Sequence, residues 1–480
     1  MLEIFFFLLL LAAFVMLYFT RWSGYRALLC LWHEQSDYFD ARRSAREMLS
    51  EEMAPSEDEP LSSESEHFPS EDEPASEDGD PLSASEEPFS DEEGTLQEPQ
   101  ADDVWSGRRC SLTDVPEVSV VVVSEGNGAV LEENLPYILR QTHPSFEVIV
   151  VDAASTDTHT SVLTSDALKR LQQEFPHLRR TYVPQSSRNI DRRLLGYTLG
   201  IRAARAPWVA VIGPDCVPES YDWLSTMMCL TGDDVDVVIG YANYFQDEDA
   251  ATRRASFGRL RRFLFFARAV LGGHAVGADS CNVVLRRAWF LEGGGFPYTV
   301  GVPFSAISLL VDSQTECGRV ALALYPDTFV RQLFPDDTEY LAEMRIQRRL
   351  AQRLRRSQAP WLLRRDTWAD TAILLFTLSF CGYVVVRVLR YIPFVDMVRS
   401  VISPVVPYAP FYDWKWLLLD IPAFVMPVAS VVLSVVTFRR LSCLFEEASF
   451  GAYPMCFHFL LPWRKLATWW KCRKMSRTAM

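Results

Sequence analysis

The stretch from Glu117 to Asp157 constrains the fold more than any other part of the chain. It begins with the β-branched apolar run Val118–Val123, continues with leucine and isoleucine at helical spacing up to Leu139, and reaches a second apolar run at Phe146–Val151. This order predicts a strand, a helix and a second strand. Because each strand is apolar on both faces, the two belong in a parallel sheet covered by helices. The sequence therefore predicts an α/β domain.

Asp152 follows the second of these strands directly. Ligands of parallel sheets bind at the carboxyl ends of the strands, so Asp152 is expected where a ligand lies. The next residues, Ala153 to Asp157, form a polar turn whose free amide groups suit an anion or ribose hydroxyls. The alternative for Asp152 is a solvated acid at the end of a strand in an ordinary α/β domain.

The order VSVVVV, then ENLPYILRQTHPSFEVIVVD, then a small-residue turn with S-T-D resembles the opening of family 2 glycosyltransferases. The resemblance covers residues 115–350 and implies a GT-A-like domain, a mostly parallel sheet flanked by helices. It also implies that Asp152 and Asp157 bind the nucleotide of a nucleotide-sugar donor. The alternating pattern agrees, since further strands are predicted at Arg180–Val183, Pro207–Ile212 and Asp236–Tyr241.

The predicted strand Pro207–Ile212 ends in the sequence GPDCVP, which resembles the D-A-D-C-x-P motif of the same family. The first acid of that motif is replaced by Gly213, and the second is kept as Asp215. The resemblance implies that Asp215 binds a divalent cation, Mn²⁺ or Mg²⁺, because such ions prefer carboxylate and phosphate oxygens. The alternative is an aspartate in a turn that precedes a proline.

Two later segments, VVIGYANYF and SCNVVLRRAWFLEGGGF, resemble the acceptor side of membrane-associated family members. The match implies substrate binding by Asn282 and Arg286. The family places its general base in an acidic cluster a little further on, where this chain reads FSAISLLVDSQTECGR. Asp312 and Glu316 are the nearest carboxylates and are the candidate catalytic bases. The family's Q-x-x-R-W signature is also altered, because Gln347, Arg348 and Arg349 stand in a basic helix without a tryptophan.

Both ends of the chain carry membrane signals. Residues 1–22 contain the apolar run Ile4–Phe19, followed by arginines, which predicts an uncleaved transmembrane anchor with a cytoplasmic carboxyl side; a cleaved signal peptide is the alternative. Residues 366–480 contain two candidate spans, Thr371–Leu389 and Trp416–Val436, which predict a hairpin that returns to the cytoplasm. We therefore expect an integral protein of the inner (plasma) membrane with a cytoplasmic catalytic domain.

Residues 47–104 form a predicted disordered, acidic linker rich in Ser, Glu, Asp and Pro, which cannot bury enough apolar surface to fold. Between Glu47 and Asp103 it holds 22 of the 62 acids and no Lys or Arg, which leaves 40 acids against 47 Lys and Arg elsewhere. A mildly basic body suits anionic lipid or a phosphorylated substrate, whereas nucleic acid is not expected as a partner. The ten cysteines show no CxxC pair or zinc spacing, which indicates a reducing compartment.

The stretch Phe257–Leu271 alternates arginine with phenylalanine and leucine. It predicts a basic, strongly apolar helix that lies on the membrane or covers the substrate cleft. The alternative is an ordinary packed helix with arginines on its wet face.

Two functions remain open. The first is a membrane-anchored glycosyltransferase that transfers a sugar from a nucleotide-sugar donor to a cell-surface glycan or lipid-linked acceptor. The second is a catalytically inactive GT-A pseudoenzyme that scaffolds or regulates a glycan-assembly complex, an alternative favoured by the missing acids. A dinucleotide-binding dehydrogenase is excluded because GxGxxG is absent, and no glycine-rich phosphate loop supports a nucleotidyltransferase.

Overall fold

The structure is a computed structural model. It describes residues 2–19, 24–52, 115–125, 128–153, 166, 168–184, 191–247, 249–296, 302–315, 319–335, 338–354, 360–390, 414–448, 450 and 463. Two site residues expected from the sequence, Asp157 and Glu316, lie outside these ranges, as does the predicted linker beyond residue 52. The chain divides into two compact units, one of residues 1–36 and 106–480, and one of residues 37–105.

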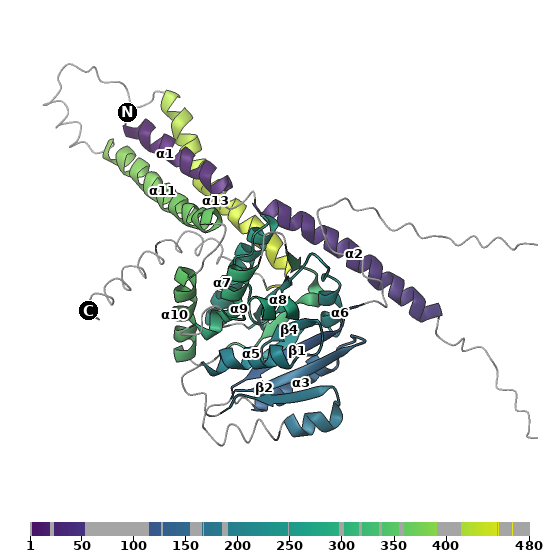
Figure 1. Ribbon diagram of the computed structural model, residues 1–480. Helices are drawn as coiled ribbons and strands as arrows, with labels where there is room; N and C mark the ends of the chain where they lie inside the picture. The colour runs from purple at the N-terminus through teal and green to yellow at the C-terminus, as the bar shows by residue number, and fades with distance from the viewer. Residues whose placement is uncertain are drawn as a thin grey trace, which may run out of the picture. The chain divides into compact units, whose positions relative to one another are not determined.

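The core of the first unit is a seven-stranded sheet, in which the predicted strands are found (Figure 1). Its strand order is β3-β2-β1-β4-β8-β6-β9, and β8 alone among these seven runs against its neighbours. The strands are β1 (Val118–Ser124), β2 (Phe146–Asp152), β3 (Leu178–Tyr182), β4 (Trp208–Ile212), β6 (Val237–Gly240), β8 (Val283–Arg286) and β9 (Val320–Ala323). The α/β class and the mainly parallel sheet are therefore confirmed.

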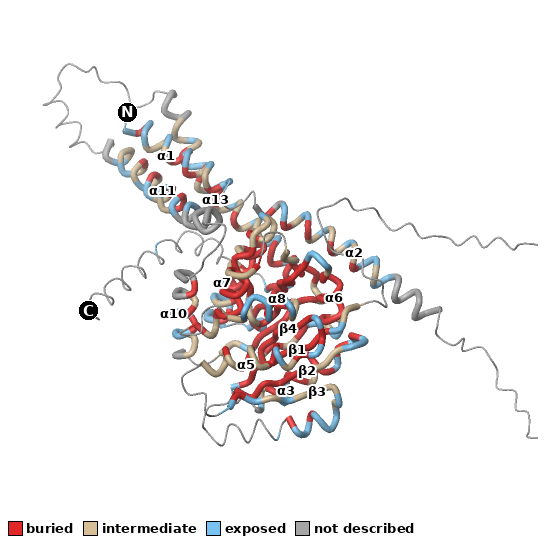
Figure 2. Tube along the Cα trace, viewed as in Figure 1, coloured by how far each residue is buried: buried red, intermediate tan, exposed pale blue. Residues whose placement is uncertain are grey.

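The central strand β1 is buried along its whole length, as its apolar run requires (Figure 2). Helix α5 (Arg192–Ala203) packs very closely on it through Gly196 and Gly200, which are one helical turn apart. A Cβ atom on Gly196 would lie 2.7 Å from Val123 Cγ1, and one on Gly200 would lie 2.5 Å from Val121 Cγ1. The two glycines let the helix backbone approach the sheet, which brings Arg193 of the same helix near the end of β1.

A second, three-stranded sheet was not predicted from the sequence. It has the order β5-β10-β7, with strands β5 (Cys216–Pro218), β7 (Ala242–Tyr244) and β10 (Val330–Gln332). Strand β10 is antiparallel to β5 and parallel to β7. Strands of three residues carry too little apolar pattern to be recognised from sequence. This sheet nevertheless brings Gln332 beside the end of β4.

Helices surround these sheets. They are α3 (Gly128–Leu139), α6 (Trp223–Met228), α7 (Ala250–Leu271), α8 (Arg287–Glu292), α9 (Ala306–Gln314) and α10 (Thr338–Leu354), with short 3₁₀ turns η2 (Pro303–Ser305) and η3 (Pro326–Thr328). Helix α7 contains the basic, apolar stretch discussed above. It buries Phe257, Leu260 and Phe263 against the domain and also lines a cavity; because Arg259 is buried too, its arginines are not confined to a wet face as the packed-helix alternative expects.

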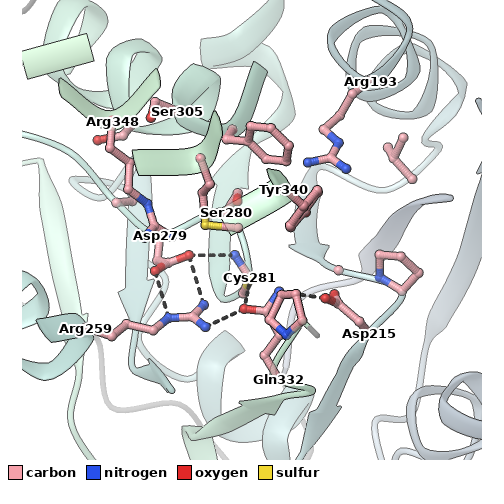
Figure 3. Close-up of a pocket in the computed structure, with 18 of the residues that line it drawn as sticks. Arg193, Asp215, Arg259, Asp279, Ser280, Cys281, Ser305, Gln332, Tyr340 and Arg348 are labelled. Carbon is pink, nitrogen blue, oxygen red and sulfur yellow. Dashed lines mark hydrogen bonds and ion pairs between the residues drawn. The ribbon is translucent and has the colours of Figure 1, made fainter. Parts of the chain in front are cut away.

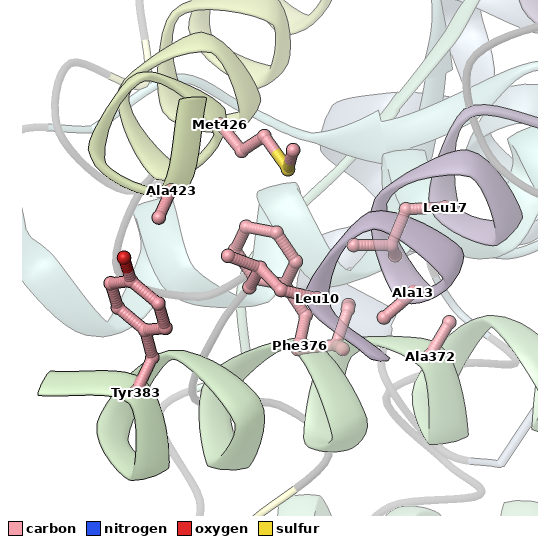
Figure 4. Close-up of a cluster of buried hydrophobic side chains, with 9 residues drawn as sticks. Leu10, Ala13, Leu17, Ala372, Phe376, Tyr383, Ala423 and Met426 are labelled. Atoms are coloured by element: carbon pink, nitrogen blue, oxygen red, sulfur yellow. The ribbon is translucent and has the colours of Figure 1, made fainter. Parts of the chain in front are cut away.

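Three apolar helices pack together: α1 (Leu2–Leu17), α11 (Pro360–Arg390) and α13 (Trp414–Leu444). Their side chains form one buried cluster, in which Leu10 and Leu17 meet Phe376 and Met426 (Figure 4). Two segments, Thr371–Val388 and Leu419–Leu444, are long and apolar enough to cross a membrane, and α1 is a shorter apolar helix. Arg387 forms an ion pair with Asp420, so a charge pair also joins α11 to α13.

The remaining helix, α2 (Gly24–Glu52), was not predicted as a helix. Its first part belongs to the first unit, where the buried Gln35 donates a hydrogen bond of 2.7 Å to the carbonyl of Leu322 and accepts one of 2.9 Å from the amide of Leu324. Residues 47–52 form its last turns, so the predicted linker begins within a helix.

Candidate active site

A cavity of about 640 Å³ opens beside the carboxyl ends of β1 and β4. Its walls come from the loop after β4, helices α5, α7 and α10, the segment Ala278–Cys281 and strand β10 (Figure 3). This is the edge of a parallel sheet at which ligands bind in such folds. Helix α10 faces it with Tyr340, Met344 and Arg348, which are spaced four residues apart and so lie on one side of the helix.

Asp215 lies in this cavity and is held by strand β10. Gln332 Nε2 donates a hydrogen bond of 2.7 Å to Asp215 Oδ2, and the amide of Leu333 donates one of 2.9 Å to the carbonyl of Asp215. The Cys216 thiol lies 3.6 Å from Asp215 Oδ1, and burial raises its pKa, so it stays a neutral thiol and is a poor metal ligand. Asp215 is thus an oriented carboxylate open to a cation.

The local packing explains why glycine stands at position 213. A Cβ atom there would lie 2.7 Å from Asp215 Oδ1 and 3.0 Å from Cys216 Sγ. Any side chain at this position would therefore push on the carboxylate that faces the cavity. In the part of the chain that the structure describes, no cluster of three metal-ligating side chains is found. A cation here would take one protein carboxylate, and its remaining ligands would be phosphate oxygens and water.

The cavity also contains an acid that the sequence analysis missed. Asp279, just before β8, forms a two-fold ion pair with Arg259, with both N–O distances at 3.1 Å. Arg259 has a side chain only 2% exposed and also donates to Gln332, so Asp279, Arg259, Gln332 and Asp215 form one chain of contacts (Figure 3). Burial opposes the charge of Asp279, but Arg259, Arg262 and Arg348 hold its pKa far below the usual range. The Asp279 carboxylate therefore acts as the counter-ion of these arginines.

Two further arginines, Arg262 of α7 and Arg348 of α10, line the cavity near Asp279. Burial, together with the charge of Arg348, lowers the pKa of Arg262 to about 9, despite the attraction of Asp279. Arg262 is therefore charged at neutral pH, and it lies close enough to Arg348 for the two guanidinium groups to repel each other. The side of the cavity away from Asp215 is positively charged.

The remaining ion pair of the cavity joins Arg193 to Glu125. Arg193 Nη2 lies 2.5 Å from Glu125 Oε2 and its Nε lies 3.1 Å from Oε1. The guanidinium also stacks on the Phe304 ring, with 4.2 Å to the ring centre. Although burial acts in the opposite direction, Glu125 raises the pKa of Arg193, which keeps the pair charged.

The cavity does not include the other site residues expected from the sequence. Asp152 is buried at the end of β2, with its Oδ2 3.4 Å from Arg180 Nη2. Asn282 is fully buried and donates two hydrogen bonds of 2.7 Å to the carbonyls of Tyr241 and Thr328. These are contacts within the fold.

Arg286 and Asp312 also lie apart from the cavity lining. Arg286 donates to the carbonyls of Gly232 and Asp233 and stacks on Trp208 at 4.8 Å. Asp312 is 3% exposed on α9. Among the described residues that the sequence predicted for the site, Asp215 is therefore the one that lines the cavity. Arg259 and Asp279 had no motif to identify them, although the arginine-rich pattern of Phe257–Leu271 pointed to the helix that carries Arg259.

Residues 119–294 match the sequence profile of glycosyl transferase family 2. A search of curated proteins finds no match. Among solved structures, the mannosyltransferase PcManGT from Pyrobaculum calidifontis, in complex with GDP-Man and Mn²⁺, is 18% identical with a TM-score of 0.43, covering 69% of this chain and 90% of that one.

A second solved structure, GalNAc-T7 with UDP, GalNAc and Mn²⁺, is 11% identical with a TM-score of 0.34, covering 46% of this chain and 44% of that one. The profile match includes β1 to β8 and the residues Asp215, Arg259 and Asp279, whereas Gln332 and Arg348 lie beyond its end. The family match thus lies on residues 119–294, the segment that forms most of the sheet and of the cavity. Residues 119–294 form a family 2 glycosyltransferase domain.

Proposed function

We propose that this protein is a membrane-anchored glycosyltransferase that moves a sugar from a nucleotide-sugar donor to a glycan or lipid-linked acceptor. The observation that carries the proposal is the Asp215 carboxylate, which faces the cavity at the carboxyl end of β4 within a family 2 domain. Its hydrogen bond from Gln332 fixes one oxygen, and the cavity volume of about 640 Å³ accommodates a nucleotide sugar.

Asp215 would hold a divalent cation, Mn²⁺ or Mg²⁺. Mg²⁺ is often bound by one or two carboxylates together with substrate phosphates and water, so a single aspartate suits it. Such an ion supplies positive charge at the leaving diphosphate. The fixed carboxylate of this chain would orient the diphosphate toward the arginines of the cavity.

Nucleotide binding is proposed for Asp152 and Asp157, and substrate binding for Asn282 and Arg286. Asn282 and Arg286 would act by shaping β8 and its neighbours, because their polar atoms already bond to the backbone. Asp312 and Glu316 remain the candidate bases for an acceptor hydroxyl.

A specific observation also supports the inactive alternative. The described lining of the cavity contains three carboxylates, and two of them, Glu125 and Asp279, are held in ion pairs with arginine. Neither is available to take a proton from a hydroxyl, and Asp215 is proposed for the cation. A scaffold that binds nucleotide without transfer to a hydroxyl would have this composition.

The apolar helices α11 and α13 support placement in a membrane, which we propose to be the inner (plasma) membrane, with the domain on the cytoplasmic side. Helix α10 lines the cavity and is followed after five residues by α11. A lipid-linked acceptor would therefore have a short path from the bilayer to the cavity.

The test measures the binding of nucleotide sugars to the detergent-solubilised full chain. Binding is detected as a shift of the melting temperature, with and without Mn²⁺. A donor that raises the melting temperature only with Mn²⁺, and does so in the wild type but not in Asp215→Asn, is the expected result. Binding that is equal in both proteins would contradict the role of Asp215. If no nucleotide sugar binds under any condition, the glycosyltransferase proposal fails.

A further inference from the structure

The segment Phe445–Glu447, which directly follows α13, packs into the interior of the domain beside the second sheet. Phe445 is fully buried, and the centre of its ring lies 4.6 Å from that of Tyr241 and 5.5 Å from that of Phe263. The side chain of Glu447 is only 2% exposed. Two of the three side chains of this segment are therefore part of the core of the domain.

The turn at the end of α13 has a defined conformation. The amide of Glu447 donates a hydrogen bond of 2.8 Å to the carbonyl of Ser442, and the amide of Glu446 donates one of 3.4 Å to the carbonyl of Cys443. This is the helix ending that usually places glycine at the left-handed position, and Glu446 occupies that position with a φ of +50°. A glutamate there costs free energy. The buried contacts of Phe445 and Glu447 offset this cost, so the domain holds the turn.

The Glu447 carboxylate joins this turn to two strands of the second sheet. Its Oε1 accepts hydrogen bonds of 2.7 Å from the Tyr241 hydroxyl and 2.8 Å from Asn243 Nδ2, and a third from Arg331 Nη1. Asn243 lies on β7 and Arg331 on β10, which are neighbouring strands. Burial and the charge of Glu447 raise the pKa of the Tyr241 hydroxyl, so Tyr241 stays a neutral donor at neutral pH. One buried carboxylate therefore fixes β10 against β7 and against the end of α13.

Strand β10 lies between the end of α13 and the cavity. Arg331 and Gln332 are consecutive residues of this strand, so their side chains lie on opposite faces of it. Arg331 faces the end of α13, where it also donates hydrogen bonds of 3.4 Å and 3.3 Å to the carbonyls of Phe445 and Glu446. Gln332 faces the cavity and donates to Asp215. A shift of β10 at the α13 side therefore changes the contact with Asp215 at the cavity side.

We propose that Glu447 is a positioning residue for the cation site: it fixes Arg331 and β10, and thereby the contact of Gln332 with Asp215. The inference rests on the proposed function, in which Asp215 holds the cation. It adds that the end of the apolar helix α13 supports the donor site and is more than an anchor. Replacing a residue that orients a metal ligand commonly weakens metal binding by roughly 10–100-fold. Glu447 acts through two further side chains, so the lower end of this range is expected.

The test uses the full chain in detergent, with UDP-glucose, UDP-N-acetylglucosamine and GDP-mannose as donor probes. The measured quantity is the Mn²⁺ concentration that gives half of the donor-induced rise in melting temperature. Glu447→Gln keeps the size of the side chain and one accepting oxygen but removes the charge that holds Arg331. It should raise this Mn²⁺ concentration about tenfold, and excess Mn²⁺ should restore the full shift. Glu447→Asp, which keeps the charge, should need less Mn²⁺ than Glu447→Gln.

Asp420 supplies the matched control, because it is also an acid paired with an arginine, Arg387, but it lies near the other end of α13. Asp420→Asn removes a charge from α13 and leaves β10 untouched. It should leave the required Mn²⁺ concentration within about twofold of the wild type, even where it lowers the melting temperature of the free protein. A rise as large as that of Glu447→Gln would show that any weakening of α13 disturbs the site, and would overturn the specific role of Glu447.

A double variant tests the route from Glu447 to Asp215. Because Glu447 acts through Gln332, Glu447→Gln combined with Gln332→Met should require no more Mn²⁺ than Gln332→Met alone. Effects of the two changes that multiply would overturn this route. If a donor shifts the wild type and Glu447→Gln at the same Mn²⁺ concentration, this inference fails and the transferase proposal stands. If none of the donors shifts the wild type at any Mn²⁺ concentration, both fail together.

Discussion

Gln332 and Asp215 are 117 residues apart in the chain, yet Gln332 Nε2 lies 2.7 Å from Asp215 Oδ2. The contact exists because β10 pairs with β5, the short strand that begins directly after Asp215. The same glutamine accepts hydrogen bonds from Arg259 and Cys281, so its amide group joins Asp215 to the ion pair of Arg259 with Asp279. The second sheet is therefore part of the site.

Replacing the Gln332 amide should leave the Asp215 carboxylate less well oriented without removing its charge. We expect Gln332→Met to weaken Mn²⁺-dependent donor binding by about tenfold or more, since a hydrogen bond to a charged group contributes about 1.5–3 kcal/mol. Titration of the donor in a thermal-shift assay measures this. Gln246→Met, which removes an exposed amide from the neighbouring segment, should leave donor binding unchanged. Equal donor affinity in the wild type and Gln332→Met would show that the hydrogen bond does not orient Asp215.

Restoring the first acid of the family's D-A-D-C-x-P motif at position 213 should not strengthen cation binding. Because a Cβ atom at position 213 would lie 2.7 Å from Asp215 Oδ1, both Gly213→Asp and Gly213→Ala are expected to displace the carboxylate and to lower Mn²⁺-dependent binding. Gly258→Ala is the control, since a Cβ there meets nothing within 4 Å on helix α7. That change should stabilise the protein by up to about 1 kcal/mol. Stronger metal dependence in Gly213→Asp would contradict this account.

A buried ion pair joins the end of α13 to the second sheet. Arg331 of β10 forms ion pairs with Glu219 and Glu447, and Glu447 also accepts hydrogen bonds of 2.7 Å from Tyr241 and 2.8 Å from Asn243. Arg331→Met should destabilise the protein by about 3–5 kcal/mol, because Glu447 stays buried without its cation. Unfolding in detergent measures the loss.

The double variant Arg331→Met with Glu447→Leu should recover part of that stability, since the fully buried carboxylate of Glu447 is then removed and only the partly exposed Glu219 is left without its arginine. Because Gln332 follows Arg331 on β10, the single variant should also reduce donor binding. If Arg331→Met is as stable as the wild type, Glu447 must instead be bonded to another partner or to water.

His143 predicts a pH dependence of stability. Burial lowers its pKa, although backbone hydrogen bonds from Ser145 and at Pro116 act in the opposite direction. The native state therefore binds fewer protons than the unfolded chain once the pH falls below the usual histidine value of about 6.5. Stability from this group is fully present above that pH and is lost as the pH falls below about 6.5 and through the lowered pKa of the folded state. Thermal unfolding of His143→Gln should vary less with pH over this interval than that of the wild type.

Much of the fold could be predicted from the sequence because its long elements carry strong periodicity. The strands β1 and β2 were found within one residue of their expected runs, and α7 contains the expected helix Phe257–Leu271. The second sheet could not be predicted, since three-residue strands such as β10 leave no pattern. Helix α2 was missed as well.

The site was predicted only where a motif carries the residue. Asp215 follows a long apolar strand within a recognisable sequence, and it lies in the cavity. Asp279 and Gln332 were missed because their role depends on contacts with Arg259 and Asp215, which are distant in sequence. Asn282 and Arg286 match the family segment, but their polar groups are bonded within the fold, which sequence spacing alone cannot reveal.

The most direct test of the central claim is release of nucleoside diphosphate by the purified full chain, measured with a nucleotide-sugar donor, Mn²⁺ and a membrane lipid extract as the source of acceptor. We predict release that requires the metal and that falls at least about a hundredfold in Asp215→Asn. Release that is the same in the wild type and Asp215→Asn would contradict the assignment of Asp215. No release with any donor or acceptor, despite donor binding, would instead identify the protein as an inactive scaffold.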